Sequence, residues 1–191
     1  MAIDDSPGEM RPDRRSASER SGPFHPISFR PAHRTFPLAR LVAELRPFLE
    51  RSVGHAAPVT PALERLVDLL RERSRTLVEM AEGSRFLATD QIRYDEKAVA
   101  KHMRPEALPV LVDLHDRLAK LGEWSDVAIE AAFEQVRARH GDLPVGRLAQ
   151  PVRIAITGRA ASPGTFATLA VLGERRAVSG IAEAIHFLRH G

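Results

Sequence analysis

Cysteine is absent from this chain of 191 residues, and its absence excludes several classes of protein at once. A chain without thiols has no disulfide framework, no cysteine-ligated zinc, no iron–sulfur cluster and no thiol nucleophile. Apolar runs are also short, since none approaches the ~20 residues that a membrane-spanning helix needs. The first ten residues lack the basic stretch and following apolar stretch of a secretory signal. We therefore expect a cytoplasmic protein with no membrane segment.

Lysine is scarce as well, because only three of the 28 positively charged residues are lysine and the other 25 are arginine. The formal net charge is only +3, although the sequence pI is about 9.9. Positive charge gathers between Arg137 and Arg176, where seven arginines stand against two acidic residues. Arginine suits phosphates and guanine edges through its forked donors. The composition thus permits nucleic-acid binding without demanding it, and a codon bias toward arginine explains it equally well.

The amino-terminal region shows no hydrophobic periodicity. Six of the 14 prolines fall in the first 37 residues, among serine, arginine and glycine. Such a segment buries too little apolar surface to offset the entropy lost on ordering. We predict a disordered tail over residues 1–36. A transit peptide would share its arginine and serine content but would lack its acidic residues.

From Leu38 onward, apolar residues recur at the three-and-four spacing of amphipathic helices. Thr60-Pro61 and Ser162-Pro163 are expected helix starts, because each pairs a capping residue with proline at the first helical position. Ser125 is a further expected cap. Helices are predicted from Leu38 to Leu49 with a kink or restart at Pro47, and then over about 61–87, 94–103, 105–122, 125–141, 163–173 and 174–188. The chain is predicted to be all-α, a multihelical protein.

Catalytic signatures are missing from the sequence. There is no glycine-rich phosphate loop and no His-Glu-x-x-His motif. His186 and His190 have metal-ligand spacing on a helix, yet no third ligand accompanies them, so exposed histidines are the better interpretation. Asp113, His115 and Asp116 share a helix but point to more than one of its faces. We expect no catalytic residue, no metal and no cofactor.

One segment carries a family resemblance. Residues 148–173, LAQPVRIAITGRAASPGTFATLAVLG, resemble the carboxy-terminal anticodon-binding region of bacterial glutamyl-tRNA synthetases, which are class I aminoacyl-tRNA synthetases. Four further segments agree with that region in order and spacing: LVAELRPFLE (41–50), LLRERSRTLVEMAEGSRFL (69–87), YDEKAVAKHM (94–103) and EW (123–124). The similarity extends over about residues 38–188.

The resemblance implies a fold of two helical subdomains, which we place at residues 37–123 and 124–191, with the second as the anticodon-binding part. It also implies a helix over 146–157 that ends at Gly158. The alternation of Val152, Ile154 and Ile156 taken alone would indicate a strand. We predict the helix.

The resemblance also implies a set of anticodon-binding residues. Arg153 holds the place of an arginine that contacts the first two anticodon bases, and Ser162, Pro163 and Thr165 lie where a loop and helix start cradle those bases. Thr165 replaces a bulkier apolar residue. Arg73 holds the place of an arginine that accompanies cytosine as the third anticodon base, which separates glutamate tRNAs from glutamine tRNAs. An ion pair on a helix surface is the alternative role for Arg73.

The chain departs from a full synthetase because the HIGH-type and KMSKS-type ATP signatures are missing. Three hypotheses follow. The first is a tRNA-binding module that binds the anticodon arm of tRNA-Glu in translation without catalysing a reaction itself. The second is a subunit of a split glutamate–tRNA ligase that needs a separate catalytic chain. The third is a helical protein-interaction relic that no longer binds RNA, in which Arg153 would be buried in an internal ion pair.

Overall fold

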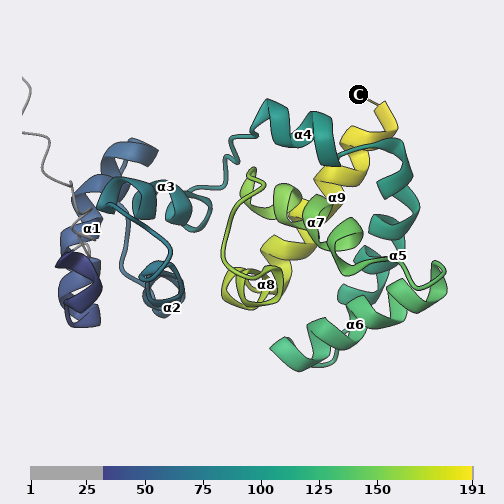
Figure 1. The fold of residues 1–191 in the computed structure, drawn as a ribbon, viewed down its shortest axis with the longest axis horizontal. Coiled ribbons are helices and arrows are strands. Elements are labelled where there is room, and N and C mark those ends of the chain that lie inside the picture. Colours follow the sequence, from purple (N-terminus) through teal and green to yellow (C-terminus); the bar gives the residue numbers. More distant parts are fainter. Residues whose placement is uncertain (1–31, 191) are drawn as a thin grey trace, which may run out of the picture. The chain divides into compact units, whose positions relative to one another are not determined.

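A computed structural model describes residues 32–190, and this part of the chain is built of helices with no strand (Figure 1). The α-helices are α1 Leu38–Val53, α2 Pro61–Leu70, α3 Leu77–Ala88, α4 Glu96–His102, α5 Leu108–Leu118, α6 Asp126–Arg139, α7 Val145–Thr157, α8 Thr165–Leu172 and α9 Glu174–His190. Two short 3-10 helices, η1 Ala32–Thr35 and η2 Pro105–Ala107, accompany them. The all-α prediction is confirmed.

The predicted tail falls mostly on residues outside the described range, since only residues 32–36 of it are described. These few residues form η1 and the approach to α1. The imidazole Nε2 of His33 lies 3.2 Å from the carbonyl oxygen of Ser74, and His33 is buried. The end of the predicted tail therefore packs on the connection between α2 and α3.

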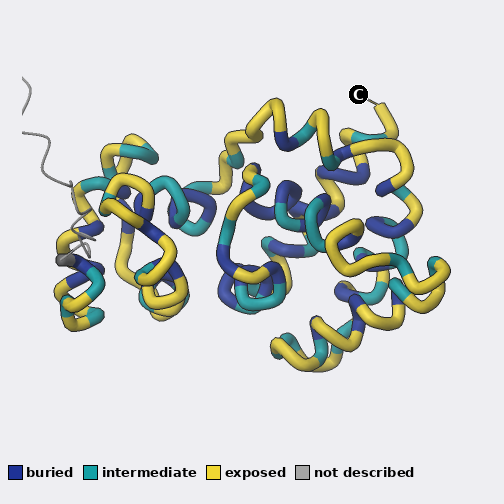
Figure 2. Tube along the Cα trace, in the orientation of Figure 1, coloured by how far each residue is buried: buried dark blue, intermediate teal, exposed yellow. Residues whose placement is uncertain are grey.

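Helices α1, α2 and α3 pack against one another. The apolar three-and-four spacing of α1 places Leu41 and Leu45 on one face, where both are fully buried. Leu66 of α2 and Met80 of α3 meet them and are also fully buried. Figure 2 shows these inward faces in dark blue and the outward faces in yellow. Pro47 lies inside α1 without ending it, so the predicted restart is absent.

The prediction of one long helix over 61–87 is wrong, because a turn at residues 71–76 divides it into α2 and α3. Thr60 caps α2 as predicted, its hydroxyl oxygen accepting the Leu63 N–H at 3.2 Å. Thr76 begins α3 in the same way, since its hydroxyl oxygen accepts the Glu79 N–H at 3.1 Å. A threonine that caps a new helix cannot continue the previous one, so α2 ends before it.

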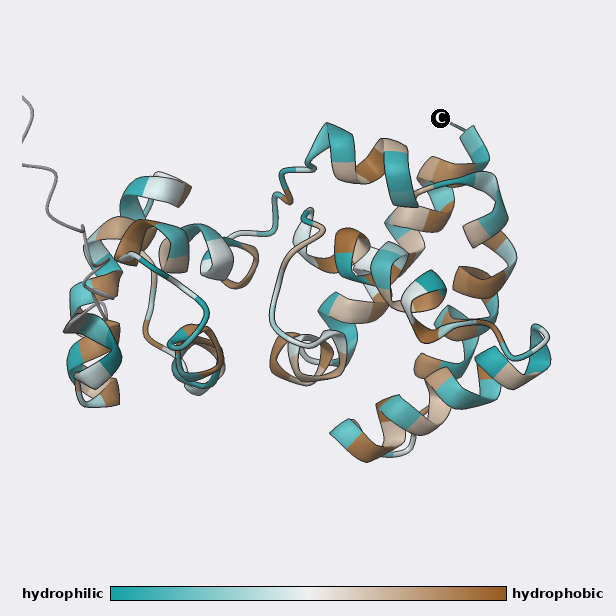
Figure 3. Cartoon of the chain, in the orientation of Figure 1, coloured by the Kyte–Doolittle hydropathy of each residue, from teal (hydrophilic) through white to brown (hydrophobic). Residues whose placement is uncertain are grey.

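The remaining helices pack mainly around α9 and α7. Helix α9 contacts α5, α7 and α8, while α7 also contacts α4. Leu114 of α5, Ile154 of α7 and Ile181 of α9 are fully buried at these contacts. The hydropathy colouring of Figure 3 shows brown apolar residues alternating with teal hydrophilic ones along these helices. Helices α4 and α5 thus have partners in the predicted second subdomain, and the division near residues 123–124 remains a prediction.

The predicted helix over 146–157 is confirmed as α7, and Gly158 ends it. Gly158 has φ +74°, and its N–H donates to the Ile154 carbonyl oxygen at 2.8 Å. Val152, Ile154 and Ile156 are all buried, as are the residues between them other than Arg153. The alternating pattern was misleading because α7 is buried around most of its circumference, so its apolar residues do not mark one face.

The predicted helix starts have different outcomes. Ser125 caps α6, with its hydroxyl oxygen accepting the Ala128 N–H at 3.3 Å. Ser162-Pro163 does not begin a helix, because α8 starts at Thr165 and Gly164 occupies the cap position. The Ser162 hydroxyl instead donates to the carbonyl oxygen of Pro163 at 2.9 Å. The serine hydroxyl is therefore occupied three residues before the helix begins at Thr165.

Candidate nucleic-acid interface

Arg153 lies in the last two turns of α7 and is half-buried. Its Nη1 donates to the Ala160 carbonyl oxygen at 3.2 Å, while its Nε is buried and has no hydrogen-bond partner. Burial, and then the charge of Arg73, lower the pKa of the Arg153 guanidinium. Arginine stays cationic at neutral pH despite such a shift. The structure thus holds a cation at this point whose donors are only partly used.

Arg73 lies in the turn between α2 and α3 and is exposed. Its backbone N–H donates to the Leu70 carbonyl oxygen at 3.0 Å, which fixes the turn. The neighbouring charges are paired elsewhere: Arg71 lies 3.4 Å from Asp68 and Glu72 lies 3.7 Å from Arg34.

The two arginines act on each other through their charges, since Arg73 contributes to the lowered pKa of Arg153. In the described part of the chain neither guanidinium forms an ion pair, so no carboxylate offsets this repulsion. Two unpaired cations held near each other favour an anionic or acceptor-rich ligand. Arg153 does not form the internal ion pair that a packing role would require.

The segment after α7 is tied back to that helix. The Thr157 hydroxyl donates to the Arg153 carbonyl oxygen at 2.7 Å and accepts the Arg159 N–H at 3.2 Å. The guanidinium of Arg153 holds the carbonyl of Ala160. These bonds place the chain immediately before Ser162 next to Arg153.

Thr165 begins α8 and is 5% exposed, yet its hydroxyl oxygen has no hydrogen-bond partner. Pro163 is buried and Ser162 is half-buried just before it. No side chain caps the N-terminus of α8, so its first N–H groups are free of a capping partner. The Thr168 hydroxyl donates to the Gly164 carbonyl oxygen at 3.0 Å and steadies this turn.

The structure therefore brings part of the predicted set together. Arg73 and Arg153 interact electrostatically, and Arg153 is bonded to the segment that leads to Ser162. Helix α8, which starts at Thr165, packs against both α2 and α7. In the described residues no hydrogen bond joins Arg73 to Ser162, Pro163 or Thr165.

Arg176 of α9 is a positioning residue that the sequence did not reveal. Its guanidinium donates to three carbonyl oxygens at the C-terminal end of α3: Phe86 at 2.8 Å, Leu87 at 3.1 Å and Thr89 at 2.8 Å. It also lies 3.3 Å from the carboxylate of Asp90. Cations are stabilising at a helix C-terminus, where carbonyls lack partners. Arg176 therefore fixes the end of α3 against α9.

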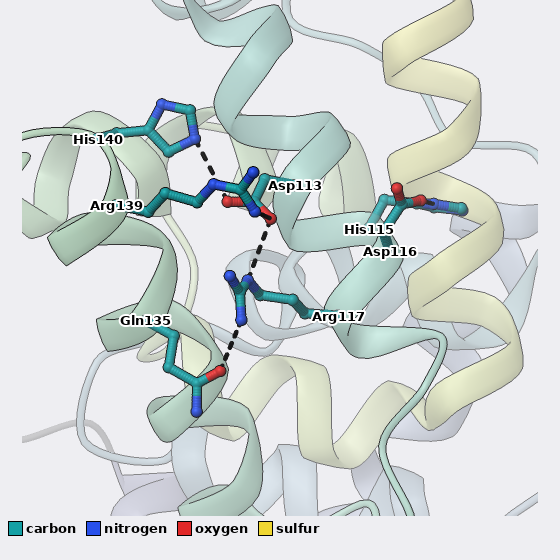
Figure 4. A network of polar contacts seen from close by, with 7 residues as sticks. All are labelled: Asp113, His115, Asp116, Arg117, Gln135, Arg139 and His140. Atoms are coloured by element: carbon teal, nitrogen blue, oxygen red, sulfur yellow. Dashed lines mark hydrogen bonds and ion pairs between the residues drawn. The ribbon is translucent and has the colours of Figure 1, made fainter.

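The polar cluster around Asp113 joins α5 to α6 (Figure 4). Its contacts are Asp113–Arg117 at 3.1 Å, Asp113–Arg139 at 3.5 Å, Asp113–His140 at 3.4 Å and Arg117–Gln135 at 2.7 Å. His115 and Asp116 pair with each other at 3.1 Å, on a different side of α5. Arg117 and Arg139 both lie at Oδ1 of Asp113, whereas its Oδ2 has no hydrogen-bond partner among the described residues. The cluster thus ties α5 to α6 as a structural network.

His186 and His190 are exposed, and the His190 Nδ1 lies 2.9 Å from the His186 carbonyl oxygen. Within residues 32–190 no group of three histidine or acidic side chains is placed to hold a metal ion. In that same range no helix is long and apolar enough to cross a membrane.

Comparison with known proteins places this geometry in a family. Residues 40–185 match the family described as "Anticodon binding domain", and the chain belongs to that family. It is similar to the glutamate–tRNA ligase of Geobacter sulfurreducens, with 39% identity over 149 residues that cover 78% of this chain and 32% of that protein. The Legionella pneumophila glutamate–tRNA ligase (strain Corby) is 40% identical over 129 residues, covering 68% of this chain and 27% of that protein.

Solved structures with a similar fold are also glutamate–tRNA ligases. A crystal structure of a glutamate tRNA ligase from Elizabethkingia meningosepticum superposes with a TM-score of 0.69 and 19% identity, over 82% of this chain and 30% of that one. The resemblance to the anticodon-binding region of glutamyl-tRNA synthetases is thereby confirmed. The chain spans about a third of the length of the curated relatives that it matches.

Proposed function

We propose that this chain is a cytoplasmic tRNA-binding module that binds the anticodon of tRNA-Glu. Its binding residues are Arg73, Arg153, Ser162, Pro163 and Thr165. The observation that carries the proposal is the state of Arg153, a half-buried cation with an unpartnered Nε that lies within the electrostatic reach of a second unpaired arginine. A ligand rich in acceptors relieves both the missing hydrogen bond and the repulsion.

The chemistry of single-stranded RNA fits these groups. Proteins bind specific RNA sequences mostly where bases are unstacked and splayed out, as in an anticodon loop. Arg153 then donates to base acceptors, and the free N–H groups at the start of α8 suit base or phosphate oxygens. The unpartnered hydroxyl of Thr165 can donate or accept at the same base. Arg73 contacts the third anticodon base and favours cytosine there.

Fluorescence anisotropy with two labelled stem-loops tests this function. One is the anticodon stem-loop of tRNA-Glu, and the other has its third anticodon base changed from C to G. We expect the change to weaken binding by about 1–3 kcal/mol, the usual scale for one well-recognised base. Equal binding of both loops, lost as salt rises, would show that the arginines are only a charged surface and would contradict the proposal.

A second candidate function is that of a subunit in a split glutamate–tRNA ligase. The length of the match favours this function, because the matched region spans only 27–32% of the length of the two glutamate–tRNA ligases compared. A chain carrying the ATP and glutamate site would then complete the enzyme. Mixing this protein with the product of a neighbouring catalytic reading frame and assaying the charging of tRNA-Glu tests the idea. A stable mixture that charges no tRNA excludes it.

A further inference from the structure

A second basic site lies at the other end of the helix that carries Arg153. A cavity of about 440 Å³ opens between the end of α4, η2 and the first turns of α7. Its lining includes the cationic side chains Lys101, Arg104 and Arg147, the imidazole of His102 and a single carboxylate, that of Glu106. Lys101, Arg104 and Arg147 are exposed. Three cations thus share one hollow with one acid.

These cations have no side-chain partners within the described part of the chain. In residues 32–190 none of Lys101, Arg104 and Arg147 forms an ion pair or a side-chain hydrogen bond. Arginines elsewhere are neutralised, as Arg117 is by Asp113 and Arg137 by Glu134. The pKa of His102 is lowered by burial and then by the charges of Lys101 and Arg104. The hollow is thus electropositive and its cations are available to a ligand.

The backbone and one amide add to the site. Helix α7 starts at Val145 without a side-chain cap, so the N–H groups of Val145 and Gly146 are open to an anion, while the Arg147 N–H donates to the Pro144 carbonyl oxygen. Gly146 lines the cavity, and a Cβ added there would have no heavy atom within 4 Å, so the space above it is free. Gln150 also lines the cavity, and its buried carboxamide oxygen has no hydrogen-bond partner. That oxygen is a hydrogen-bond acceptor, and a ribose 2′-hydroxyl reaches it when the Gln150 side chain turns toward the cavity.

The cavity shares helix α7 with Arg153, and its lining along that helix extends to Pro151. Gly146, Gln150 and Arg153 follow each other at spacings of four and three, so they lie on one face of the helix. The seven residue steps from Gly146 to Arg153 correspond to about 10 Å along the helix axis, a length that a few nucleotides of one strand cover. An RNA whose bases contact Arg153 therefore carries its own backbone past this cavity.

We propose that the cavity between α4 and α7 binds the phosphodiester backbone of the same RNA, with Lys101, Arg104 and Arg147 on phosphate oxygens and Gln150 on a ribose hydroxyl. The inference rests on the proposed tRNA-binding function. It adds a contact that anchors the strand without distinguishing its sequence, since phosphate contacts position a nucleic acid while base contacts specify it. The site would strengthen binding equally for RNAs with either third anticodon base.

The test is the salt dependence of binding to the full tRNA-Glu transcript by the full chain. The variant Lys101→Ala/Arg104→Ala removes two cavity cations. The matched control Lys120→Ala/Arg189→Ala removes two exposed cations that do not line the cavity. Each lost contact to a single-strand phosphate should reduce the slope of log K against log salt by about 0.7, which is about fivefold in affinity between 1 M and 0.1 M salt. The cavity variant loses two such contacts, so we expect a slope reduced by about 1.4, or about 25-fold in affinity over the same range, and no change for the control.

A charge insertion gives a second readout. Gly146→Glu places a carboxylate in open space at the mouth of the cavity and needs no unusual backbone conformation there. It should weaken tRNA binding at least as much as the double variant while leaving the preference between C and G at the third anticodon base unchanged. A loss of that base preference would show that the cavity belongs to the anticodon site and would overturn the proposal.

Two further measurements show whether a negative result concerns the backbone site, the proposed function or both. Arg153→Ala is measured in the same titration. If it weakens binding while the cavity variant follows the control, the backbone site is wrong and the proposed function stands. If Arg153→Ala also has no effect, both fail. Inorganic phosphate is titrated while the His102 imidazole signal is followed by NMR. Saturation by phosphate together with unchanged tRNA binding in the cavity variant would assign the hollow to a free phosphate and overturn the RNA inference.

Discussion

Gly158 and Arg93 approach each other so closely that a Cβ on the glycine would lie 2.0 Å from the Arg93 carbonyl oxygen. A backbone hydrogen bond joins the same two segments, since the Asp95 N–H donates to the Gly158 carbonyl oxygen at 2.8 Å. The end of α7 is therefore packed directly against the segment between α3 and α4. This contact positions the chain that follows Arg153.

The first prediction is that Gly158→Ala destabilises the fold strongly. Its φ of +74° costs any other residue about 1–2 kcal/mol, and the contact with Arg93 adds a backbone clash that no rotamer relieves. We expect a loss of about 3 kcal/mol or more in the free energy of unfolding, measured by urea denaturation. Gly141→Ala is the matched control, because Gly141 also has φ +74° but nothing within 4 Å of an added Cβ. Equal losses for the two variants would show that the contact with Arg93 is unimportant.

The second prediction concerns Arg176, which donates to three carbonyl oxygens at the end of α3. Arg176→Lys should destabilise the fold by about 1–3 kcal/mol, because one ammonium cannot reproduce the planar fork and leaves carbonyls without partners. The neighbouring Arg175 is exposed, so Arg175→Lys is the control and should change little. Thermal unfolding followed by circular dichroism compares them. An unchanged unfolding midpoint for Arg176→Lys would contradict the role of Arg176 in fixing the end of α3.

The third prediction separates binding from stability at Arg153. The side chain is half-buried, has an unpartnered Nε and is repelled by Arg73. Arg153→Met keeps the apolar stem but removes the charge and the hydrogen bond to the Ala160 carbonyl oxygen. Because the relief of burial and repulsion offsets the lost bond, the free energy of unfolding should stay within about 0.5 kcal/mol of the wild type. Binding of the tRNA-Glu anticodon stem-loop should fall at least tenfold. A variant that loses stability and binding together would point to a structural role instead.

The sequence predicts some elements of this structure better than others. The resemblance correctly predicted α7 and its end at Gly158, where local alternation indicated a strand. The apolar spacing could not locate the break between α2 and α3, because Leu70 and Leu77 are seven residues apart and keep the stripe in phase across the turn. The local signal for the break was Thr76 followed three residues later by Glu79, the pattern of a helix N-terminus.

The residues of the candidate site remain a prediction from the resemblance, and the sequence does not predict which of their polar atoms lack hydrogen-bond partners. Arg153, Ser162 and Thr165 follow from a motif, but the missing partners of Arg153 Nε and Thr165 Oγ1 depend on how α7 and α8 pack. Arg176 could not be found at all, since its acceptors lie 87–90 residues away in the chain. Tertiary contacts of that range leave no periodic signal in a sequence.

The last prediction uses His102 as a reporter of the basic cavity. Burial and the charges of Lys101 and Arg104 lower its pKa, and Glu106 and Arg147 line the same hollow. The native state therefore binds the histidine proton less tightly than the unfolded chain, so this group's contribution makes the free energy of unfolding fall as the pH drops through the ordinary histidine range. NMR titration should give a midpoint below the usual value of about 6.5. Lys101→Ala/Arg104→Ala should move that midpoint upward, because two of the repelling charges are gone. A midpoint that stays in place would mean that burial alone sets it and that the cavity carries little positive field.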